Sequence, residues 1–462
     1  MKKNDIAEVT IEDIGVNGEG IGKVNGYTLF IKDGIIGDRV TVKVMKAKKN
    51  YGYARLMKII DPSPHRVTAR CPVARQCGGC QIQEMAYDKQ LGFKENKVTA
   101  NLARIGGIDR QYLEKIMEPI IGMEEPFRYR NKAQFPIGRD KDGHAIAGFY
   151  AGRTHAIIEN QDCFLGVKEN ERILKCLLQF ADEFQLSVYD EETHIGLLRH
   201  VLIRTGFRTG EVMVCLVING DALPHHEVLA GRLAALVNLE SMTLSVNKEK
   251  GNVIMGNEIK LLYNKPYITD YIGEVKYRIS PLSFYQINPV QTEKLYELAL
   301  EYADLKGNEI VWDLYCGIGT ISLFLARKAR QVYGVEIIPD AIDDARVNAE
   351  INGIDNVDFF VGKAEEVLLR MCCEKQVRAD VIVVDPPRKG CEEGLLATMV
   401  EMQPERIVYV SCDSATLARD VKYLCEHGYE MRRGRAVDQF AHTVHVETVC
   451  KLCRKNGDCK DS

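Results

Sequence analysis

Short apolar runs, each closed by glycine or a polar residue, recur through the second half of the chain and predict strands that alternate with helices. Ile310–Leu314 precedes a Gly-x-Gly turn and an amphipathic stretch, and Val332–Ile337, Val381–Val384 and Ile407–Val410 follow at helix-length intervals. Such alternation is typical of a doubly wound parallel sheet in an α/β protein. Ligands of these sheets bind at the carboxyl ends of the strands, so the loops after these runs are candidates for chemistry.

Residues 1–60 carry a different pattern, in which short strands are separated by glycines. Val9–Ile11, Thr28–Ile31 and Arg39–Val44 are the apolar runs, and their spacing predicts a small β-barrel. The segment is basic, with 11 Lys and Arg against 7 Asp and Glu, whereas the whole chain has a net charge of −4. Its stretch 46–53 mixes lysines with tyrosines. This favours contact with nucleic-acid phosphates and bases, although a solvated hairpin tip fits equally well.

The length of the chain favours several domains, and we expect three. Their limits are 1–61 for the barrel, 62–270 for a mixed α/β central domain and 271–462 for the doubly wound domain. The central part has strand patterns at 198–204 and 210–218. A helix predicted around 87–97 carries several cations, which we expect to be solvated because most charged helix faces are.

The chain shows no sign of a membrane or secreted protein. No apolar run is long enough to cross a membrane, and the amino terminus lacks the apolar core of a signal peptide. We therefore expect a cytoplasmic protein without a membrane partner. In that reducing setting the 15 cysteines indicate metal binding, catalysis or packing rather than a disulfide framework.

Three cysteines fall within ten residues, at Cys71, Cys77 and Cys80, with paired glycines between the last two. Glycines let the backbone wrap closely around an inorganic centre, and three thiolates need a fourth. Cys163 is the best candidate because it is the only other cysteine before Cys176, which lies in an apolar helical stretch. The spacing fits an iron-sulfur cluster or a tetrathiolate zinc site, and this choice stays open here.

A second group, Cys450, Cys453 and Cys459, is a weaker candidate for a metal site. Cys450 belongs to the predicted strand 444–452. Successive side chains of a strand point to opposite faces, so the thiol three residues on should point away from it. We expect no metal there.

The Gly-x-Gly turn has the shape of a nucleotide-binding unit. Gly317 and Gly319 let a ligand approach the backbone, and Asp313 lies near the end of the preceding strand. Glu336 ends the next strand, about twenty residues further on, where an acidic residue can bond ribose hydroxyls. The third glycine of a dinucleotide site and the lysine of a triphosphate site are missing. A nucleoside sulfonium donor fits this pattern better.

Asp385-Pro-Pro-Arg388 follows another predicted strand. Paired prolines stiffen a loop whatever its task, so a purely structural role is one interpretation. The other is that the stiff turn holds the Asp385 carboxylate toward an amine, amide or hydroxyl of a ligand, while Arg388 meets a phosphate.

Cys412 lies just after the strand 407–410, and Glu447 follows downstream. A lone cysteine is ordinarily a buried, inert residue. Its place at a strand end favours a second interpretation, a thiolate that adds to C6 of a uracil ring and makes C5 nucleophilic toward a methyl donor. A base must then remove the C5 proton, and Glu447 is the candidate by residue type and order.

Together these motifs resemble the S-adenosylmethionine-dependent RNA uracil-5-methyltransferase family over essentially the whole chain, and within it the bacterial 23S ribosomal RNA branch. The motifs are Ser411-Cys412-Asp413, Asp385-Pro-Pro-Arg388, the run 438–447 and Ser283-Phe-Tyr-Gln-Ile-Asn288. Family members often have a proline where this chain has Ala441. The resemblance implies a Rossmann-like class I methyltransferase domain at the carboxyl terminus, an OB-fold-like TRAM barrel at the amino terminus, and a central domain with a four-iron four-sulfur (4Fe-4S) cluster.

The resemblance also implies roles for individual residues. Cys412 is the nucleophile and Glu447 the general base. The donor S-adenosylmethionine is contacted by Gln286, Tyr315, Glu336 and Asp385, and the cluster is held by Cys71, Cys77, Cys80 and Cys163. Because methyl transfer needs no electron transfer, the cluster supports folding or RNA binding. The implied partner is 23S rRNA, and the implied state is a monomer.

Three alternative functions share part of this pattern. A tRNA uracil-5-methyltransferase has the same chemistry, but that branch typically lacks the barrel and the cluster cysteines. A non-catalytic iron-sulfur protein that binds RNA or senses redox state would leave Cys412 and Glu447 unexplained. DNA cytosine methylation fits poorly, because that class has its cysteine directly after a Pro-Pro pair, where this chain has Arg388.

Overall fold

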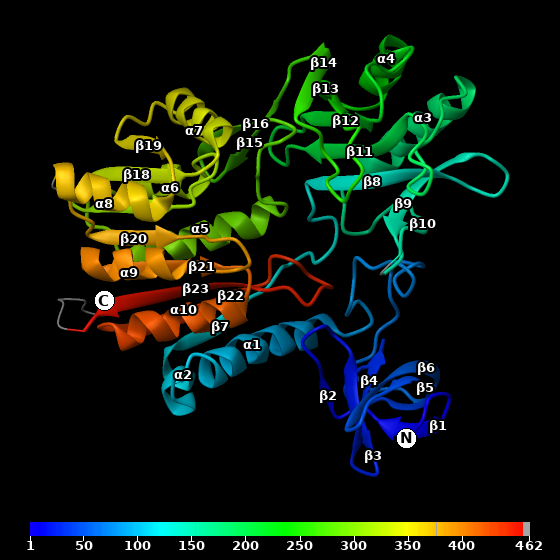
Figure 1. Ribbon diagram of the computed structural model, residues 1–462, viewed down its shortest axis with the longest axis horizontal. Coiled ribbons are helices and arrows are strands. Elements are labelled where there is room, and N and C mark those ends of the chain that lie inside the picture. Colours follow the sequence, from blue (N-terminus) through cyan, green and yellow to red (C-terminus); the bar gives the residue numbers. More distant parts are fainter. Residues whose placement is uncertain (153, 376, 456–462) are drawn as a thin grey trace.

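A sheet of eight strands forms the carboxyl-terminal body of the protein (Figure 1). The computed structural model describes residues 1–152, 154–375 and 377–455. The strand order is β19-β18-β17-β20-β21-β23-β22-β7. The strands are β17 (Ile310–Leu314), β18 (Gln331–Glu336), β19 (Val357–Val361), β20 (Val381–Val384), β21 (Arg406–Ser411), β22 (Tyr429–Val437), β23 (Glu447–Arg454) and β7 (Met117–Ile121). The first five are parallel, and β23 runs antiparallel to both β21 and β22.

Helices cover both faces of this sheet, as the alternating pattern predicts. One face packs on α5 (Pro289–Ala303), α6 (Thr320–Ala326) and α7 (Pro339–Ile351). The other packs on α1 (Tyr87–Arg104), α2 (Arg110–Ile116), α8 (Ala364–Lys375), α9 (Glu393–Met402) and α10 (Ser414–Glu426). Within β17, Val311 joins the first layer and Trp312 the second, because successive side chains point to opposite faces. The doubly wound α/β fold is confirmed.

The amino-terminal strands form the expected small barrel, with the order β1-β5-β6-β4-β3-β2. They are β1 (Ile6–Thr10), β2 (Asp13–Ile14), β3 (Gly20–Val24), β4 (Tyr27–Lys32), β5 (Arg39–Ala47) and β6 (Tyr51–Asp61). Inward residues such as Leu29, Ile31 and Val42 form its core. Gly22 permits a close approach of strands, since a Cβ there would lie 2.5 Å from the carbonyl oxygen of Thr10.

A seven-stranded sheet lies between these two bodies in sequence, with the order β10-β9-β8-β11-β12-β13-β14. Its strands are β8 (Lys132–Arg139), β9 (Ala145–Tyr150), β10 (Ile157–Glu159), β11 (Leu198–Thr205), β12 (Val212–Ile218), β13 (Leu239–Val246) and β14 (Glu258–Asn264). Helices α3 (Glu169–Glu183) and α4 (His226–Leu236) share its core. A hairpin of β15 (Ile268–Ile272) and β16 (Val275–Ile279) follows. The strands expected at 198–204 and 210–218 are both present.

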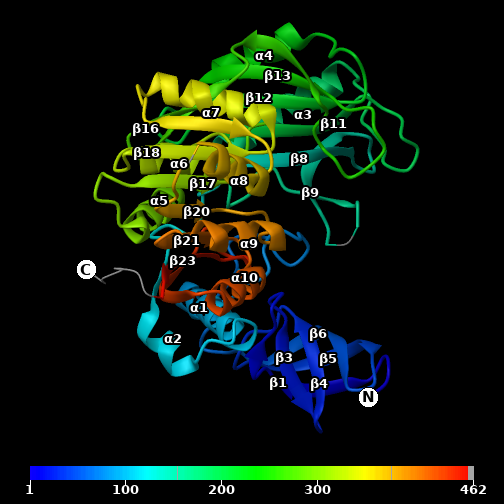
Figure 2. The ribbon, with the colours of Figure 1, turned by 60° about the vertical axis from the view of Figure 1, so that its left-hand side comes forward.

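The segment 87–121 departs from the simple order of domains along the chain. It lies within the expected central domain, 62–270, but β7 pairs with β22, beside which it lies in Figure 1. Helix α1 packs against α10, and these two helices lie side by side in both ribbon views (Figures 1 and 2). The three sequence-based domain limits remain predictions. No helix within the described ranges is both long and apolar enough to cross a bilayer.

Candidate active site

Cys412 occupies the tight turn between β21 and α10. The Ser411 side chain accepts a hydrogen bond from the Asp413 N–H at 3.2 Å and donates one to the Asp413 carbonyl at 3.0 Å. Asp413 caps α10, accepting hydrogen bonds from the N–H groups of Ala415 at 2.9 Å and Thr416 at 3.0 Å. The half-buried thiol is therefore held by a rigid turn at the carboxyl edge of the sheet.

Glu447 reaches the same edge because β23 runs in the opposite direction. The register places Ser411 opposite Thr448. Because the strands are antiparallel, Cys412, which follows Ser411, lies beside Glu447, which precedes Thr448. The Glu447 side chain is only 4% exposed. The two residues chosen from motif order are thus neighbours in space.

Burial controls the protonation of both groups. It raises the pKa of the Cys412 thiol to about 12, and the nearby carboxyls of Glu447 and Asp385 add to this rise. Burial, followed by the charge of Asp385, raises the pKa of Glu447 to about 8. The Arg388 guanidinium opposes both shifts. At neutral pH the free protein therefore holds Cys412 as a thiol beside a largely protonated carboxyl.

Asp385 directly follows β20, the neighbour of β21 in the sheet. Burial, followed by the charge of Asp313, raises its pKa to about 7. The exposed Arg388 lies on the same Pro-Pro turn, and its carbonyl accepts a hydrogen bond from the Thr416 hydroxyl at 3.2 Å. The Pro-Pro turn is thus fastened to the helix that follows Cys412, and it carries both a carboxyl and a cation into the site.

The Gly-x-Gly loop follows β17 at the same edge. Gly319 has φ +81°, and a Cβ there would lie 3.0 Å from the Phe359 ring, so the position requires glycine. The Glu336 carboxylate accepts a hydrogen bond from the Gly317 N–H at 3.3 Å. It also accepts hydrogen bonds from the backbone N–H groups of the two residues that follow Glu336, at 2.8 and 3.0 Å. Asp313, fully buried below the loop, accepts a hydrogen bond from the Ser322 hydroxyl at 2.5 Å.

Gln286 and Tyr315 reach this loop in different ways. The Gln286 side chain is hydrogen-bonded to the Tyr296 hydroxyl, which donates to the Thr320 hydroxyl at 3.0 Å. The Tyr315 backbone lies in the turn with φ +72°, while its side chain packs on the apolar layer that contains Cys391. The structure therefore brings Gln286, Glu336 and Asp385 around the loop, with Tyr315 in the loop itself.

Comparison with known proteins agrees with this geometry. The family model for tRNA (uracil-5-)-methyltransferase matches residues 222–455, and the TRAM domain model matches residues 2–57. Proteins named "uncharacterized RNA methyltransferase" are similar over the full length. The one from Clostridium tetani is 50% identical over 100% of this chain and 98% of the relative. The one from Halalkalibacterium halodurans is 50% identical over 99% of this chain and 98% of the relative.

The chain belongs to the RNA uracil-5-methyltransferase family.

A solved structure of this family has the same fold. Pyrococcus abyssi tRNA (uracil-54, C5)-methyltransferase in complex with S-adenosyl-L-homocysteine superposes with a TM-score of 0.78 and 30% identity, over 96% of this chain and 100% of that one. The protein is therefore an S-adenosylmethionine-dependent RNA methyltransferase with an amino-terminal TRAM domain. The alternative of a non-catalytic iron-sulfur protein is not supported.

The four predicted cluster ligands of this methyltransferase, Cys71, Cys77, Cys80 and Cys163, line a single cavity of about 350 Å³. Among the described residues, however, no three His, Cys, Asp or Glu side chains are grouped so that they could hold a metal ion. The predicted metal centre is therefore not confirmed. Of the second cysteine group, Cys459 lies outside the described residues.

The surroundings of the cysteine cavity suit thiolate ligands. Cys77 accepts a hydrogen bond from the Gly79 N–H and Cys80 one from the Gln83 amide, both at 3.4 Å. The cations Arg130 and Lys132 also line the cavity. Burial raises the pKa of Cys80 to about 12, so this thiol stays protonated unless a metal or a cationic partner stabilises the thiolate.

The barrel of the methyltransferase presents a cationic and aromatic face. Phe30, Tyr51 and Tyr53 form a ring cluster with centroids 5.6 to 5.9 Å apart, and the two tyrosines are 38% and 42% exposed. Cations are paired across the strands with these tyrosines or with their neighbours. Lys46 pairs with Tyr53, and both Lys43 and Lys32 pair with Arg55. Lys23 pairs with Thr28, which in turn pairs with Tyr51. None of these paired positions, all within the described part of the chain, carries a carboxylate.

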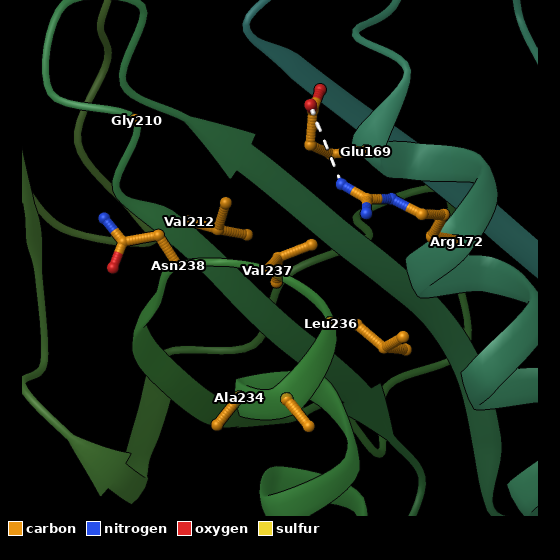
Figure 3. Close-up of a pocket in the computed structure, with 9 residues that line it drawn as sticks. Glu169, Arg172, Gly210, Val212, Ala234, Leu236, Val237 and Asn238 are labelled. Atoms are coloured by element: carbon orange, nitrogen blue, oxygen red, sulfur yellow. Dashed lines mark ion pairs between the residues drawn. The ribbon is translucent and has the colours of Figure 1, made fainter.

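A cavity of about 370 Å³ on the central sheet is unrelated to the active site. Figure 3 shows that mostly apolar side chains line it, with Val212, Leu236 and Val237 among them. Its two charged residues, Glu169 and Arg172, form an ion pair with each other at 4.0 Å. We assign it no role in methyl transfer.

Sequence reasoning missed two features of the site. Tyr296 lies on α5 among apolar residues, and no motif distinguishes it. Lys94, on the helix whose cations were expected to be solvated, is instead fully buried against Asp438. A signal was available, because Lys94 precedes Val98 and Leu102 at steps of four and so falls on the apolar stripe of its helix.

We predict that the thiol of Cys412 in the free methyltransferase reacts slowly with iodoacetamide, and that its rate keeps rising between roughly pH 7 and 9, by less than about tenfold per pH unit because Glu447 ionises in this range and disfavours the thiolate. The reason is the raised pKa of about 12, below which the thiolate fraction grows with pH. Arg388→Met should slow the reaction by raising that pKa further, and Glu447→Gln should accelerate it. Mass spectrometry of the Cys412 peptide measures the rate.

Lys389→Met is the matched control, because Lys389 is exposed and paired with Glu392. It should leave the alkylation rate unchanged. A rate that stops rising below about pH 8 would contradict the raised pKa.

Proposed function

We propose that this protein transfers a methyl group from S-adenosylmethionine to C5 of uridine in 23S rRNA. Cys412 would form a covalent adduct with C6, and Glu447 would act as the general base. The observation that carries the proposal is the placement of a thiol and a buried carboxyl side by side, at the sheet edge that also carries the Gly-x-Gly loop.

Cys412 begins the reaction in this proposal. Its Sγ loses a proton and forms a bond to C6 of the uracil, so that electron density moves to C5. S-adenosylmethionine, when bound, supplies a methyl group on a positively charged sulfur. C5 then takes that methyl group as the bond from the methyl carbon to the donor sulfur breaks, which would leave S-adenosylhomocysteine. Arg388 supports the first step, because its positive charge favours the Cys412 thiolate.

Glu447 completes the reaction. Its carboxylate removes the proton from C5, the C5–C6 double bond re-forms, and the bond between C6 and Cys412 breaks. A pKa of about 8 suits this task near neutral pH, because the carboxyl can both accept and release a proton there. Burial next to Asp385 is the physical cause of that value.

Gln286, Tyr315, Glu336 and Asp385 are the proposed donor contacts. Glu336 ends β18, where a carboxylate can accept hydrogen bonds from ribose hydroxyls. Asp385 and Gln286 lie around the same loop and can orient the amine and amide groups of a donor. A bound sulfonium would add positive charge near Asp385 and Glu447 and lower the pKa of both carboxyls.

The cysteine cavity is the proposed site of a 4Fe-4S cluster. Four cysteines that line a cavity of about 350 Å³, rather than converging on one point, favour a multi-iron cluster over a single zinc ion. Amide hydrogen bonds to sulfur and the two lining cations would stabilise its negative charge. Cys71, Cys77, Cys80 and Cys163 would be its ligands, and its role would be structural or in RNA binding.

Transfer RNA is the second candidate substrate. The similar Pyrococcus abyssi enzyme acts on tRNA, and its alignment leaves out only 4% of this chain, less than the length of the barrel. The barrel therefore does not distinguish the two substrates. The cysteine motif favours 23S rRNA. We further propose that the protein is cytoplasmic and that it is a monomer, the latter because one chain supplies the whole site.

Tritium release tests the proposal directly. The protein should release tritium from C5-tritiated uracil in 23S rRNA transcripts when S-adenosylmethionine is present. Cys412→Ala should abolish release, because alanine cannot form the adduct with C6, and Glu447→Gln should trap a covalent protein–RNA adduct visible on denaturing gels. Cys425→Ala, at a half-buried cysteine near the end of α10, is the control and should stay active.

Parallel assays on tRNA separate the two substrates. Release from tRNA transcripts alone would move the assignment to tRNA. Release from neither RNA, with S-adenosylmethionine bound, would refute the uracil-5 activity proposed for this chain.

The cationic and aromatic face of the barrel is the proposed RNA contact. Tyr53→Ala should weaken RNA binding at least about fivefold, since a stacked base is worth roughly 1–3 kcal/mol. Lys46→Ala should also reduce the dependence of affinity on salt. Tyr263→Ala, an equally exposed tyrosine on β14, is the control. Equal effects of the two tyrosine variants would exclude this face.

The proposed cluster predicts a colour and a selective loss. Anaerobically purified protein should be brown, and Cys80→Ala should be colourless, whereas Cys176→Ala in α3 should keep its colour. Chelation of the iron should weaken RNA affinity more than affinity for S-adenosylhomocysteine. A colourless native protein containing zinc, or equal loss of both affinities, would contradict the prediction.

A further inference from the structure

The loop that leads into Glu447 connects the two antiparallel strands β22 and β23. Val437 and Glu447 are the last paired residues of β22 and β23, and residues 438–446 connect them. Glu447 therefore depends on how this loop is held. We call residues 438–446 the base loop.

One buried ion pair fastens the start of the base loop. The Lys94 ammonium lies 2.5 Å from Asp438 Oδ1 and donates to the Phe440 carbonyl at 3.0 Å. Asp438 Oδ2 accepts a hydrogen bond from the Tyr87 hydroxyl at 2.8 Å. The side chains of Lys94 and Asp438 are both 0% exposed.

Further residues of the same helix hold the rest of the base loop. The Gln90 Oε1 accepts from the His442 N–H at 2.9 Å, and its amide lies 3.1 Å from His442 Nδ1. The Lys97 ammonium donates to the Val444 carbonyl at 3.0 Å. Contacts therefore extend from the first residue of the loop nearly to Glu447.

The helix also reaches the nucleophile. The Asn101 amide donates to the Ser414 hydroxyl at 2.8 Å, two residues beyond Cys412. Tyr87, Gln90, Lys94, Lys97 and Asn101 follow one another at steps of three and four, so they form one stripe of α1. A single rigid helix thus spans the loops of both catalytic groups.

Stability alone is a poor reason for this stripe. Taking an ammonium and a carboxylate out of water costs several kcal/mol per ion, and apolar residues of similar volume often stabilise as well or better. A buried ion pair does disfavour arrangements that separate its two charges, because each separated charge would be left buried without compensation. The arrangement favoured here is that of the base loop.

We propose that Lys94 is a positioning residue for the general base, acting through Asp438 and the Phe440 carbonyl. This rests on the proposed role of Glu447. Glu447 acts only after the bond from Cys412 to C6 and the bond from C5 to the methyl group have formed. Loss of its position therefore slows proton removal from C5 and cleavage of the C6–Sγ bond, while thiol addition and methyl transfer continue.

The test follows both labels in one reaction. RNA tritiated at uracil C5 is incubated with S-adenosylmethionine carrying a radioactive methyl group. In Lys94→Met, methyl label should accumulate in a protein–RNA complex stable to denaturation, while tritium release slows about tenfold or more, as for a small misplacement of a catalytic group. Glu447→Gln gives the reference adduct, and Lys89→Met, an exposed lysine of the same helix, should behave as the native protein.

Two further variants separate position from folding. Lys94→Met combined with Asp438→Asn removes the uncompensated carboxylate but still leaves the Phe440 carbonyl without its donor, so the adduct should persist in a stably folded protein. Lys97→Met removes a contact only to the later part of the base loop, and Lys97 is less buried than Lys94. This variant should therefore accumulate less adduct than Lys94→Met.

The outcomes are distinct. If Glu447→Gln traps adduct while the folded double variant and Lys97→Met turn over normally, the ion pair is only structural and the inference is wrong. The inference is also wrong if these variants slow methyl transfer and tritium release equally and no protein–RNA adduct accumulates. If Glu447→Gln itself traps no adduct, the proposed function fails instead.

Discussion

The pairing of β21 with β23 is the constraint on which the active site depends. Parallel strands deliver their carboxyl ends to one edge of the sheet, and the antiparallel β23 brings its first residue there instead. With Ser411 opposite Thr448, Cys412 and Glu447 become neighbours although they come from separate motifs. A slip of one residue would turn the Glu447 side chain to the other face. The apolar layers on both faces, which fix the strand register, therefore also fix the positions of Cys412 and Glu447.

The same edge gathers acidic groups in a place where water is scarce. Asp313, Asp385 and Glu447 each have a raised pKa because of burial, and the charge of Arg388 opposes the rise in the pKa of Cys412 and Glu447. Such a site disfavours additional negative charge, including that of a thiolate. A positively charged donor is its natural complement, because it relieves the repulsion that burial creates. In the proposed reaction, electrostatics would thus link donor binding to activation of the Cys412 thiol.

The first half of the chain is attached to the base loop at several points. The N–H groups of Gln81 and Ile82, next to the cysteine motif, donate to the His442 carbonyl at 3.0 and 3.2 Å. The Tyr129 hydroxyl donates to the Ala441 carbonyl at 3.0 Å. Val444 packs in a small apolar cluster with Ile14 of the barrel. The barrel, the cysteine cavity, α1 and the methyltransferase sheet therefore all border the one loop that leads to Glu447.

The sequence by itself determined the α/β class and the barrel, because apolar periodicity is a local property that survives without knowledge of contacts. The order of its motifs also selected Cys412 and Glu447 as candidates, and their catalytic roles are proposed. The sequence did not indicate that β7 pairs with β22, and it treated Lys94 as a solvated cation. Only tertiary structure decided those points. A strand's partner and a side chain's burial depend on what packs against them, and for Lys94 the partner lies 344 residues away along the chain. The local sequence pattern shows which face of a helix is apolar. Whether a polar group on that face is buried depends on the segment, distant in the sequence, that packs against it.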